Sequence, residues 1–443
     1  MIVHLAASTT DRTAHGIAQA IGSLVADGTV SVGERLPTVR EVARVMGVSP
    51  TTVSEAWQTL QRHGIIETQR RRGTFVSERS GAMASRFWQV PVARGRYEID
   101  LSTGTPDPDL LPDPAAFFGA MGRAPRMTSY LDRPVLVGLE EQLRSTWPFD
   151  PEYITVVNGA LDALDRVIAT AIPFASKVIV SDPTFPPILD MLDLVGATAI
   201  GVAIDEEGLD PGAVAEALHR NDVAAIIVQP RAHNPTGASW SRTRTAELAS
   251  VLGPTSLVIV EDDHSGPVSG AELHSLGTYL PGRVTHIRSF SKSHGPDFRL
   301  AAIGGPADPV MSLIRRRRLG PSWTSRLLQQ LLLDMLRSPK VGAEVEHAAQ
   351  IYRQRWVTMY DSLSERGVSV RTGSGLNMWV PVRDETVATV SLAANGIGVA
   401  PGRPFCIAAG GAPHVRITTS VIATEPSVVA NKIADAALLD PRA

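Results

Sequence analysis

The chain of 443 residues has one cysteine and no long apolar stretch. Cys406 is that cysteine, so an internal disulfide is impossible and an oxidising compartment is not indicated. No run of about 18 apolar residues occurs, which argues against a membrane span. The N-terminus also lacks the basic start and apolar block of a signal peptide. The sequence therefore predicts a cytoplasmic protein with no membrane partner.

The chain also lacks a strong overall charge. Its 42 lysines and arginines stand against 45 aspartates and glutamates, a formal net charge of -3. Any surface that binds nucleic acid must therefore be local. Hydrophobic residues make up 44% of the chain and charged residues 20%, which is ordinary for a globular protein. The length allows roughly three domains of about 150 residues each.

Lysine is scarce as well, and one of the four lysines has a distinctive setting. Lys292 ends the segment Ser-Phe-Ser-Lys, which follows a strand-like apolar stretch at 284–287, and Arg299 lies downstream. A lysine that forms a Schiff base needs a free amine in a dry pocket. Hydroxyls and an arginine suit a phosphate on the same ligand. A loop lysine beside serines is the alternative that this stretch alone leaves open.

Residues 1–78 predict a small helical domain with a wing. The expected elements are helices over 15–26, 38–46 and 50–63, and a two-stranded hairpin over 65–76. Thr38 and Glu41 have the spacing of a capping box, and Gly47 can take the positive φ of a tight turn. This order is a helix-turn-helix, whose third helix can enter a major groove.

Polar and basic residues gather on the parts of this domain that would face DNA. The third helix exposes Thr51, Thr52, Ser54, Glu55 and Gln58 to the groove. Arginines suit phosphate contacts, and the candidates are Arg35, Arg40 and the wing residues Arg70, Arg71 and Arg72, which precede Gly73. A helical domain used only for dimerisation or docking is the alternative.

The segment GERLPTVREVARVMGVSPTTVSEAWQTLQRHGIIE, with its RRRGTFV wing, resembles the winged-helix domain of the GntR family of bacterial transcription regulators. The Gly-x-x-Leu-Pro-x-x-Arg start and the Gly-Val-Ser-x-x-Thr-Val turn carry the resemblance. It implies DNA contacts by Arg40 and by the opening of the recognition helix, namely Ser49, Thr51 and Thr52. Pro50 and Ser54 stand where basic residues are frequent in the family, so the wing is expected to supply more of the affinity.

Residues 79–98 predict a linker, because apolar alternation ends and the composition turns to Ser, Gly, Ala, Pro and Arg. Residues 99–443 then alternate strands and helices. The expected strands are 153–157, 177–180, 198–204, 223–228 and 256–260, and the helices between them are 159–171, 187–194, 211–219 and 242–252. This alternation predicts an α/β domain with a mostly parallel sheet covered on both faces. Ligands of such sheets bind outside the carboxyl ends of the strands.

The residues after successive strands form an informative series. They are Asn158-Gly159-Ala160-Leu161-Asp162, Asp182-Pro183-Thr184-Phe185, Asn234-Pro235-Thr236-Gly237, Glu261-Asp262-Asp263-His264, and then the lysine segment. Each alone usually caps a helix or makes a turn. Together they fit an aromatic, phosphorylated aldehyde, with a helix start for its phosphate and a carboxylate for its ring nitrogen.

This order resembles the fold type I pyridoxal-phosphate enzymes, the aspartate aminotransferase-like group. The resemblance implies that Lys292 forms the internal aldimine, that Asp262 pairs with the pyridinium nitrogen, and that Asn234 bonds the ring hydroxyl. It implies a phosphate site made by Gly159, Ala160, Leu161, Ser289, Ser291 and Arg299, and by Tyr130 lent to the partner subunit. Arg416 matches the arginine that binds a substrate carboxylate.

The chain departs from that family at two ring contacts. Phe185 stands where a tyrosine usually stacks on the ring, and His264 stands where a tyrosine usually reaches the ring hydroxyl. Both changes spare cofactor binding but argue against normal transamination. The segments 375–380 and 400–405 resemble the smaller α+β domain of the family, where Asn377 and Arg403 either face an effector or only shape the domain.

A GntR-type winged helix fused to an aminotransferase-like domain resembles the MocR subfamily of transcription regulators. The resemblance implies a homodimer that binds a double-stranded DNA operator and senses pyridoxal 5'-phosphate, or a small amine or amino acid through its aldimine. No metal site is predicted. The alternatives are an active aminotransferase with an accessory DNA-binding module and a cofactor-binding scaffold without a DNA role. The sequence names neither the effector nor the operator, and does not distinguish activator from repressor.

Overall fold

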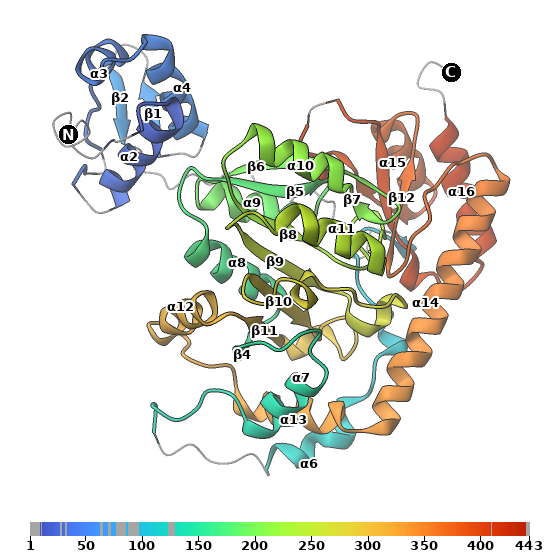
Figure 1. Cartoon of the computed structure of the whole chain (residues 1–443). Helices are drawn as coiled ribbons and strands as arrows, with labels where there is room; N and C mark the ends of the chain where they lie inside the picture. The colour runs from blue at the N-terminus through green and yellow to red at the C-terminus, as the bar shows by residue number, and fades with distance from the viewer. Residues whose placement is uncertain are drawn as a thin grey trace.

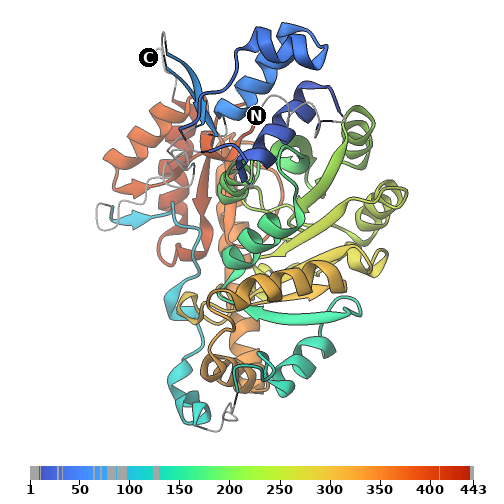
Figure 2. The ribbon, with the colours of Figure 1, turned by 90° about the vertical axis from the view of Figure 1, so that its left-hand side faces the viewer.

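A computed structural model describes residues 9, 11–26, 29–31, 33–62, 65–69, 72–76, 86, 97–122, 129–408 and 410–439. We call residues 9–76 the head and residues 97–439 the body. In two perpendicular views the head lies at one end of the body, opposite the end that carries α6 (Phe118–Met121), α7 (Val137–Ser145) and α13 (Arg326–Leu336) (Figures 1 and 2). Within the described ranges, no helix is long and apolar enough to cross a membrane.

The described part of the head contains the three helices and the two-stranded wing that the sequence predicts. They are α2 (Ala14–Ala26), α3 (Val39–Met46), α4 (Pro50–Arg62), β1 (Ile66–Gln69) and β2 (Gly73–Val76). The predicted capping box is present: the Glu41 amide donates to Thr38 Oγ1 at 3.3 Å, and the Thr38 amide donates to Glu41 Oε2 at 2.8 Å. Gly47 then ends α3 in the left-handed conformation, with a φ of 67°.

The body contains an eight-stranded sheet in the order β4-β11-β10-β9-β8-β5-β6-β7. The strands are β4 (Tyr153–Val157), β5 (Lys177–Asp182), β6 (Thr198–Asp205), β7 (Gly208–Leu209), β8 (Val223–Val228), β9 (Val258–Asp263), β10 (Val284–Ser289) and β11 (Ala301–Gly305). Pairing is parallel from β10 to β6, whereas β11 runs antiparallel to both neighbours and β7 runs antiparallel to β6. The sheet is therefore mixed and mostly parallel.

One strand boundary differs from the sequence prediction in a way that affects the site. Glu261, Asp262 and Asp263 were expected just after a strand ending at residue 260, but they are the last three residues of β9. The strand continues because β10 runs beside it, with Asp262 opposite Ile287 and Asp263 opposite Arg288. Successive side chains of this acidic segment therefore point to opposite faces of the sheet.

Helices cover both faces of the sheet. One apolar layer joins alternate strand residues such as Val178 and Val180 to α8 (Ala160–Ala171), α9 (Pro186–Leu194) and α12 (Ala307–Arg318). The other joins Ile179 and Ile226 to α10 (Pro211–Arg220) and α11 (Arg242–Leu252). The period of two along β5 thus decides which helix layer each side chain meets.

A smaller unit completes the body beyond the long helix α14 (Pro339–Glu365). It consists of β12 (Asn377–Pro381), β14 (Ala400–Pro401), β15 (His414–Thr418), α15 (Glu385–Ala394) and α16 (Pro426–Leu438), with strand order β12-β15-β14. The segment that enters the body also joins it, because β3 (Ile99–Asp100) pairs in parallel with β13 (Ile397–Gly398). Residues 102–105 are thereby carried to the junction of the two sheets.

Candidate functional site

A cavity of about 440 Å³ lies between the carboxyl ends of the central strands and the smaller unit. Eleven of the residues predicted from the sequence line it: Ala160, Leu161, Phe185, Asn234, Asp262, His264, Ser289, Ser291, Lys292, Arg299 and Arg416. The chain brings them together from positions up to 256 residues apart. This is the edge at which an open α/β sheet is expected to bind a ligand.

Lys292 lies in this cavity just beyond the end of β10. Its Nζ donates a hydrogen bond to the Gly104 carbonyl at 2.5 Å. Burial, together with a smaller effect of the nearby charge of Arg416, lowers the pKa of the Lys292 amine to about 8. A larger fraction of the amine is therefore unprotonated near neutral pH than in an exposed lysine, as a nucleophile for an aldehyde requires.

Asp262 has one carboxylate oxygen in use and one free. Gln229 donates to Oδ2 at 2.8 Å, whereas the buried Oδ1 has no hydrogen-bond partner among the described residues. The pKa of Asp262 is raised to about 7, mainly by burial. The hydrogen bond from Gln229 lowers it, and the charge of Asp263 raises it slightly. A buried, unsatisfied acceptor facing a cavity fits a cationic N–H donor on a ligand. The protonated ring nitrogen of pyridoxal phosphate is such a donor.

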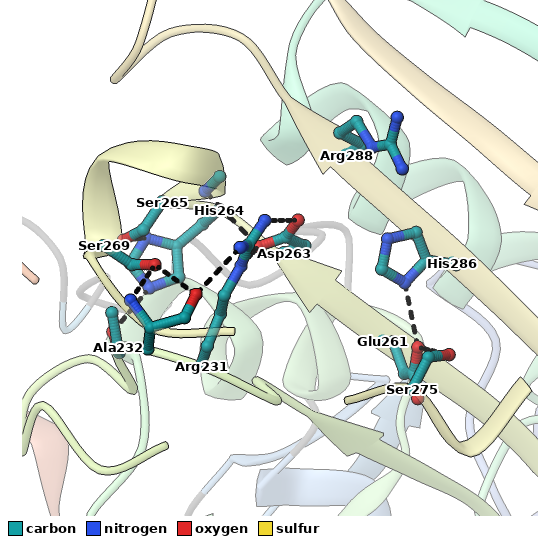
Figure 3. Close-up of polar contacts among 12 residues, drawn as sticks. Arg231, Ala232, Glu261, Asp263, His264, Ser265, Ser269, Ser275, His286 and Arg288 are labelled. Carbon is teal, nitrogen blue, oxygen red and sulfur yellow. Dashed lines mark hydrogen bonds and ion pairs between the residues drawn. The ribbon is translucent and has the colours of Figure 1, made fainter. Parts of the chain in front are cut away.

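The two flanking acids lie on the opposite face of β9 from Asp262. Figure 3 shows their polar contacts with neighbouring side chains. Asp263 accepts bonds from Arg231 Nε and Nη2, both at 2.7 Å. Burial alone would raise the pKa of Asp263, but the charge and hydrogen bonds of Arg231 hold it below its ordinary value. Glu261 Oε2 lies 2.8 Å from His286 Nδ1 and accepts from Ser275 at 2.7 Å. Neither carboxylate is available to a ligand.

Arg416 lies opposite, on β15 of the smaller unit. Its guanidinium carbon lies 5.3 Å from the centre of the Phe405 ring, and its Nη2 donates to the Ser102 carbonyl. Its Nη1 lies 3.5 Å from Asn234 Oδ1, and its buried Nε has no partner among the described residues. Burial lowers the pKa of Arg416 to about 10, so the group remains cationic at neutral pH. A guanidinium with an unsatisfied N–H fits a carboxylate.

His264 lines the cavity with both ring nitrogens already engaged. Nε2 lies 3.0 Å from the Ala232 carbonyl, and Nδ1 lies 3.2 Å from the Ser265 hydroxyl. Burial lowers the pKa of His264 to about 4, so the ring is neutral. Its expected bond to a ring hydroxyl stays a prediction, because it requires one of these two contacts to give way.

The other end of the cavity has the features of a phosphate site. Ala160 and Leu161 begin α8, and Gly159 caps it with a φ of 96°. A Cβ added at Gly159 would lie 3.2 Å from Arg299 Nη2, so glycine allows the guanidinium to approach the helix end. Ser289 and Ser291 line the same region. Free amide groups, hydroxyls and a guanidinium suit a dianion.

One predicted cofactor residue lies apart, and other lining residues were not predicted. Tyr130 is 89% exposed, outside the cavity, with its ring 5.8 Å from that of Trp323. Its contact with a partner subunit's phosphate stays a prediction. The lining residues that were not predicted are Ser102, Thr103, Gly104, Thr105, Leu164, Pro186, Gln229, Ser265, Leu376 and Phe405. Gln229 directly follows β8, so the strand-end signal could have found it, whereas residues 102–105 carry no such signal.

The head exposes most of the residues predicted to meet DNA. Thr51 at the start of α4 is exposed, as are Arg35, Arg40 and Arg72, while Arg70 and Arg71 lie outside the described residues. Ser49 also has a structural role, because its hydroxyl accepts from the Thr52 amide at 3.0 Å and caps α4. A Cβ on Gly73 would lie 2.8 Å from Arg35 Nε, so Arg35 lies over the wing.

Comparison with known families agrees with this two-part arrangement. Residues 97–433 match the family of aminotransferases of class I and II, and residues 13–76 match the gntR family of bacterial regulatory proteins. The vitamin B6 salvage pathway transcriptional repressor PtsJ of Salmonella typhimurium is 32% identical over 93% of this chain and 95% of its own length. The pyridoxine biosynthesis transcriptional regulator PdxR of Corynebacterium glutamicum is 25% identical over 79% of this chain and 78% of its own.

Solved structures share the fold of the body. An archaeal alanine:glyoxylate aminotransferase superimposes with a TM-score of 0.70 at 22% identity, covering 76% of this chain and 90% of the other. The α-aminoadipate aminotransferase LysN of Thermus thermophilus gives 0.68 at 21% identity, covering 80% and 95%. At this identity the likeness concerns the fold alone.

Proposed function

We propose a function for this chain, which belongs to the GntR-type regulators of the MocR subfamily. In these regulators an aminotransferase class I and II domain follows a winged helix. The chain is a DNA-binding transcription regulator. We propose that its body binds pyridoxal phosphate and that this binding changes how the head binds DNA. The observation that carries the cofactor proposal is the unsatisfied Oδ1 of Asp262 in a cavity that also holds Lys292.

In this proposal each group in the cavity has one task. Pyridoxal phosphate, when bound, supplies an electrophilic aldehyde and an electron-poor ring. Lys292 holds it covalently, Asp262 keeps a proton on its ring nitrogen, and Asn234 orients its ring hydroxyl. Phe185 packs on the ring. The phosphate is held by Gly159, Ala160, Leu161, Ser289, Ser291 and Arg299.

Arg416 defines the second ligand in the proposal. Its free Nε–H lies in the same cavity as Lys292 and suits a carboxylate, so the effector is pyridoxal phosphate alone or an amino acid that reaches it. PtsJ and PdxR are named for vitamin B6 salvage and pyridoxine biosynthesis, which supports pyridoxal phosphate as the signal. As a regulator of bacterial DNA the protein would act in the cytoplasm.

A gel shift on the DNA upstream of the protein's own gene tests this function. We expect the purified protein to retard that DNA, and the apparent affinity to change when pyridoxal phosphate is added. An unrelated DNA of equal length is the control for sequence-independent binding. Retention of pyridoxal phosphate without any binding to the upstream DNA would leave the aminotransferase alternative as the better account.

The wing is expected to hold phosphates. Replacing Arg70, Arg71 and Arg72 by alanine should weaken binding to operator and random DNA alike, because these contacts are independent of sequence. Each lost contact should lower the slope of log affinity against log salt by about 0.9. Thr51→Ala serves as the contrasting variant, since it should affect mainly the operator. An unchanged salt slope in the triple variant would mean that the wing does not touch DNA.

The protein is expected to be a homodimer with two heads on one DNA. Tyr130, Leu131 and Leu319 are each more than 85% exposed, and we propose that the partner subunit covers them. Footprinting should show two half-sites separated by a whole number of turns of about 10 base pairs. Light scattering that gives a monomer, together with a single protected half-site, would contradict this.

A further inference from the structure

Helix α9 connects the cofactor cavity to the surface on which the head rests. Phe185, which caps the helix, and Pro186, its first residue, both line the cavity. The helix ends at Leu194, and Gly196, two residues further on, has a φ of 71°. Ile188, Leu189 and Leu192 bury one face of α9 in the core of the body, so a displacement at one end is carried to the other.

The first contact between α9 and the head is made through Phe174, in the loop between α8 and β5. Its ring packs against the apolar core of the head. A Cβ added to Gly22 of α2 would lie 2.3 Å from this ring, and so would a Cβ added to Gly196. The ring is thus held between a glycine of the head and a glycine at the end of α9.

Helix α9 also contacts the segment between head and body, through an ion pair with Arg86. Its backbone amide donates to Asp190 Oδ1 at 3.0 Å, and its Nη1 lies 3.3 Å from the same oxygen and 2.5 Å from Asp193 Oδ2. Asp190 and Asp193 are three residues apart and share one face of α9. We call Phe174, Asp190, Asp193 and Gly196 the dock.

The residues before α9 are bonded to the smaller unit at the cavity. The Thr184 amide donates to the Phe405 carbonyl at 2.8 Å, and the Ile407 amide donates to Asp182 Oδ1 at 3.1 Å. Phe405 lines the cavity and lies under Arg416. A ligand that contacts Phe185, or that moves Phe405 through Arg416, therefore acts on the segment that begins α9.

The dock leaves the DNA-binding face of the head uncovered. Gly22 places α2 against the body, and α2 lies on the side of the head that faces the body (Figure 1). Thr51 and Gln58 of α4 are exposed. The dock therefore does not block the recognition helix, but it fixes the direction in which that helix points.

We propose that α9 and the dock transmit occupancy of the cavity to the orientation of the head. This rests on the proposed function, since it takes pyridoxal phosphate as the ligand. A ligand can shift the head only by as much as it favours one position of α9 over another. A head whose direction changes alters the geometry of two heads on one DNA, without any change in the residues that read bases.

Amide hydrogen exchange on the full-length protein, with and without pyridoxal phosphate, tests the coupling. Three changes, which we call the dock variants, alter the dock or the head residue that meets it: Phe174→Ala, the double change Asp190→Asn/Asp193→Asn, and Gly22→Ala. The last one keeps α2 a good helix, because alanine is a better helix former than glycine, but places a methyl group against Phe174. Glu216→Gln on α10, where Glu216 pairs with Arg220 at the surface, is the matched control. Visible absorbance reports separately whether the cofactor is bound.

In wild type and in Glu216→Gln, pyridoxal phosphate should change exchange in both α9 and α2. In the dock variants α9 should still respond to the cofactor, whereas the exchange of α2 should no longer change, because the contact that joins α2 to the end of α9 is weakened. If all the dock variants bind the cofactor and α2 still responds to it as in wild type, the coupling is refuted but the proposed function is not. Absence of a bound cofactor in wild type would overturn the proposed function and the coupling with it.

Discussion

Replacement of Lys292 by alanine is expected to abolish covalent retention of pyridoxal phosphate and leave the fold intact. Lys292 is the only lysine that lines the described part of the cavity. Its Nζ donates a hydrogen bond to the Gly104 carbonyl and forms no ion pair with the described residues, so its loss leaves no partner carboxylate unpaired. After borohydride reduction and denaturation, wild type should keep one label per chain on the peptide that contains residue 292, and the variant should keep none.

Lys340→Ala is the matched control, because Lys340 is an exposed lysine paired with Glu344 at 3.7 Å. It should retain the label fully. A reducible visible chromophore that survives in Lys292→Ala would refute the assignment of this residue. Retention of the protein's thermal midpoint in both variants would show that the loss is chemical and does not come from unfolding.

The pH dependence of covalent uptake should follow the lowered pKa of Lys292. Only the unprotonated amine attacks an aldehyde, so the rate should rise with pH and level off above about 8. An ordinary lysine would level off only above about 10.4. Stopped-flow absorbance across this range measures the midpoint. A rate that still rises steeply between about pH 9 and 10 would mean that burial and Arg416 do not lower the pKa of the amine as argued.

Replacement of Asp262 is expected to weaken cofactor binding, whereas replacement of Asp263 is expected to destabilise the fold. Asp262→Ala should weaken binding of pyridoxal phosphate by roughly 10- to 100-fold, because a charge-assisted bond to the ring nitrogen is lost. Its thermal midpoint should fall less than that of Asp263→Ala, since Asp262 accepts a single side-chain hydrogen bond, from Gln229, and forms no ion pair with an arginine. Asp263→Ala should instead leave Arg231 buried without its carboxylate and lower the free energy of unfolding by about 3–5 kcal/mol.

Two measurements separate these outcomes: cofactor affinity by titration and the midpoint of thermal unfolding. Arg231→Met combined with Asp263→Ala should recover much of the lost stability, because the uncompensated charge is removed together with its partner. Binding that depends more on Asp263 than on Asp262, in a protein of unchanged stability, would reverse the assignment of the ring contact.

Local signals in the sequence determined the elements and most of the candidate site. The capping box of Thr38 and Glu41 and the turn at Gly47 involve residues a few positions apart, so they can be read without a structure. The same holds for the alternation of strands and helices that predicts the sheet. Because parallel strands end at one edge, Lys292, Asn234 and Asp262 could be expected together before their neighbours were known.

Only the tertiary structure decided how those residues are used. The length of β9 depends on β10 beside it, and that pairing turns Asp262 toward the cavity and Asp263 toward Arg231. Gly104 reaches Lys292 across 188 positions, and Phe174 meets Gly22 across the junction of head and body. Such contacts join residues far apart in the chain, and their burial and unsatisfied atoms exist only after packing. Sequence periodicity carries no record of them, because it reports only what lies within a few residues.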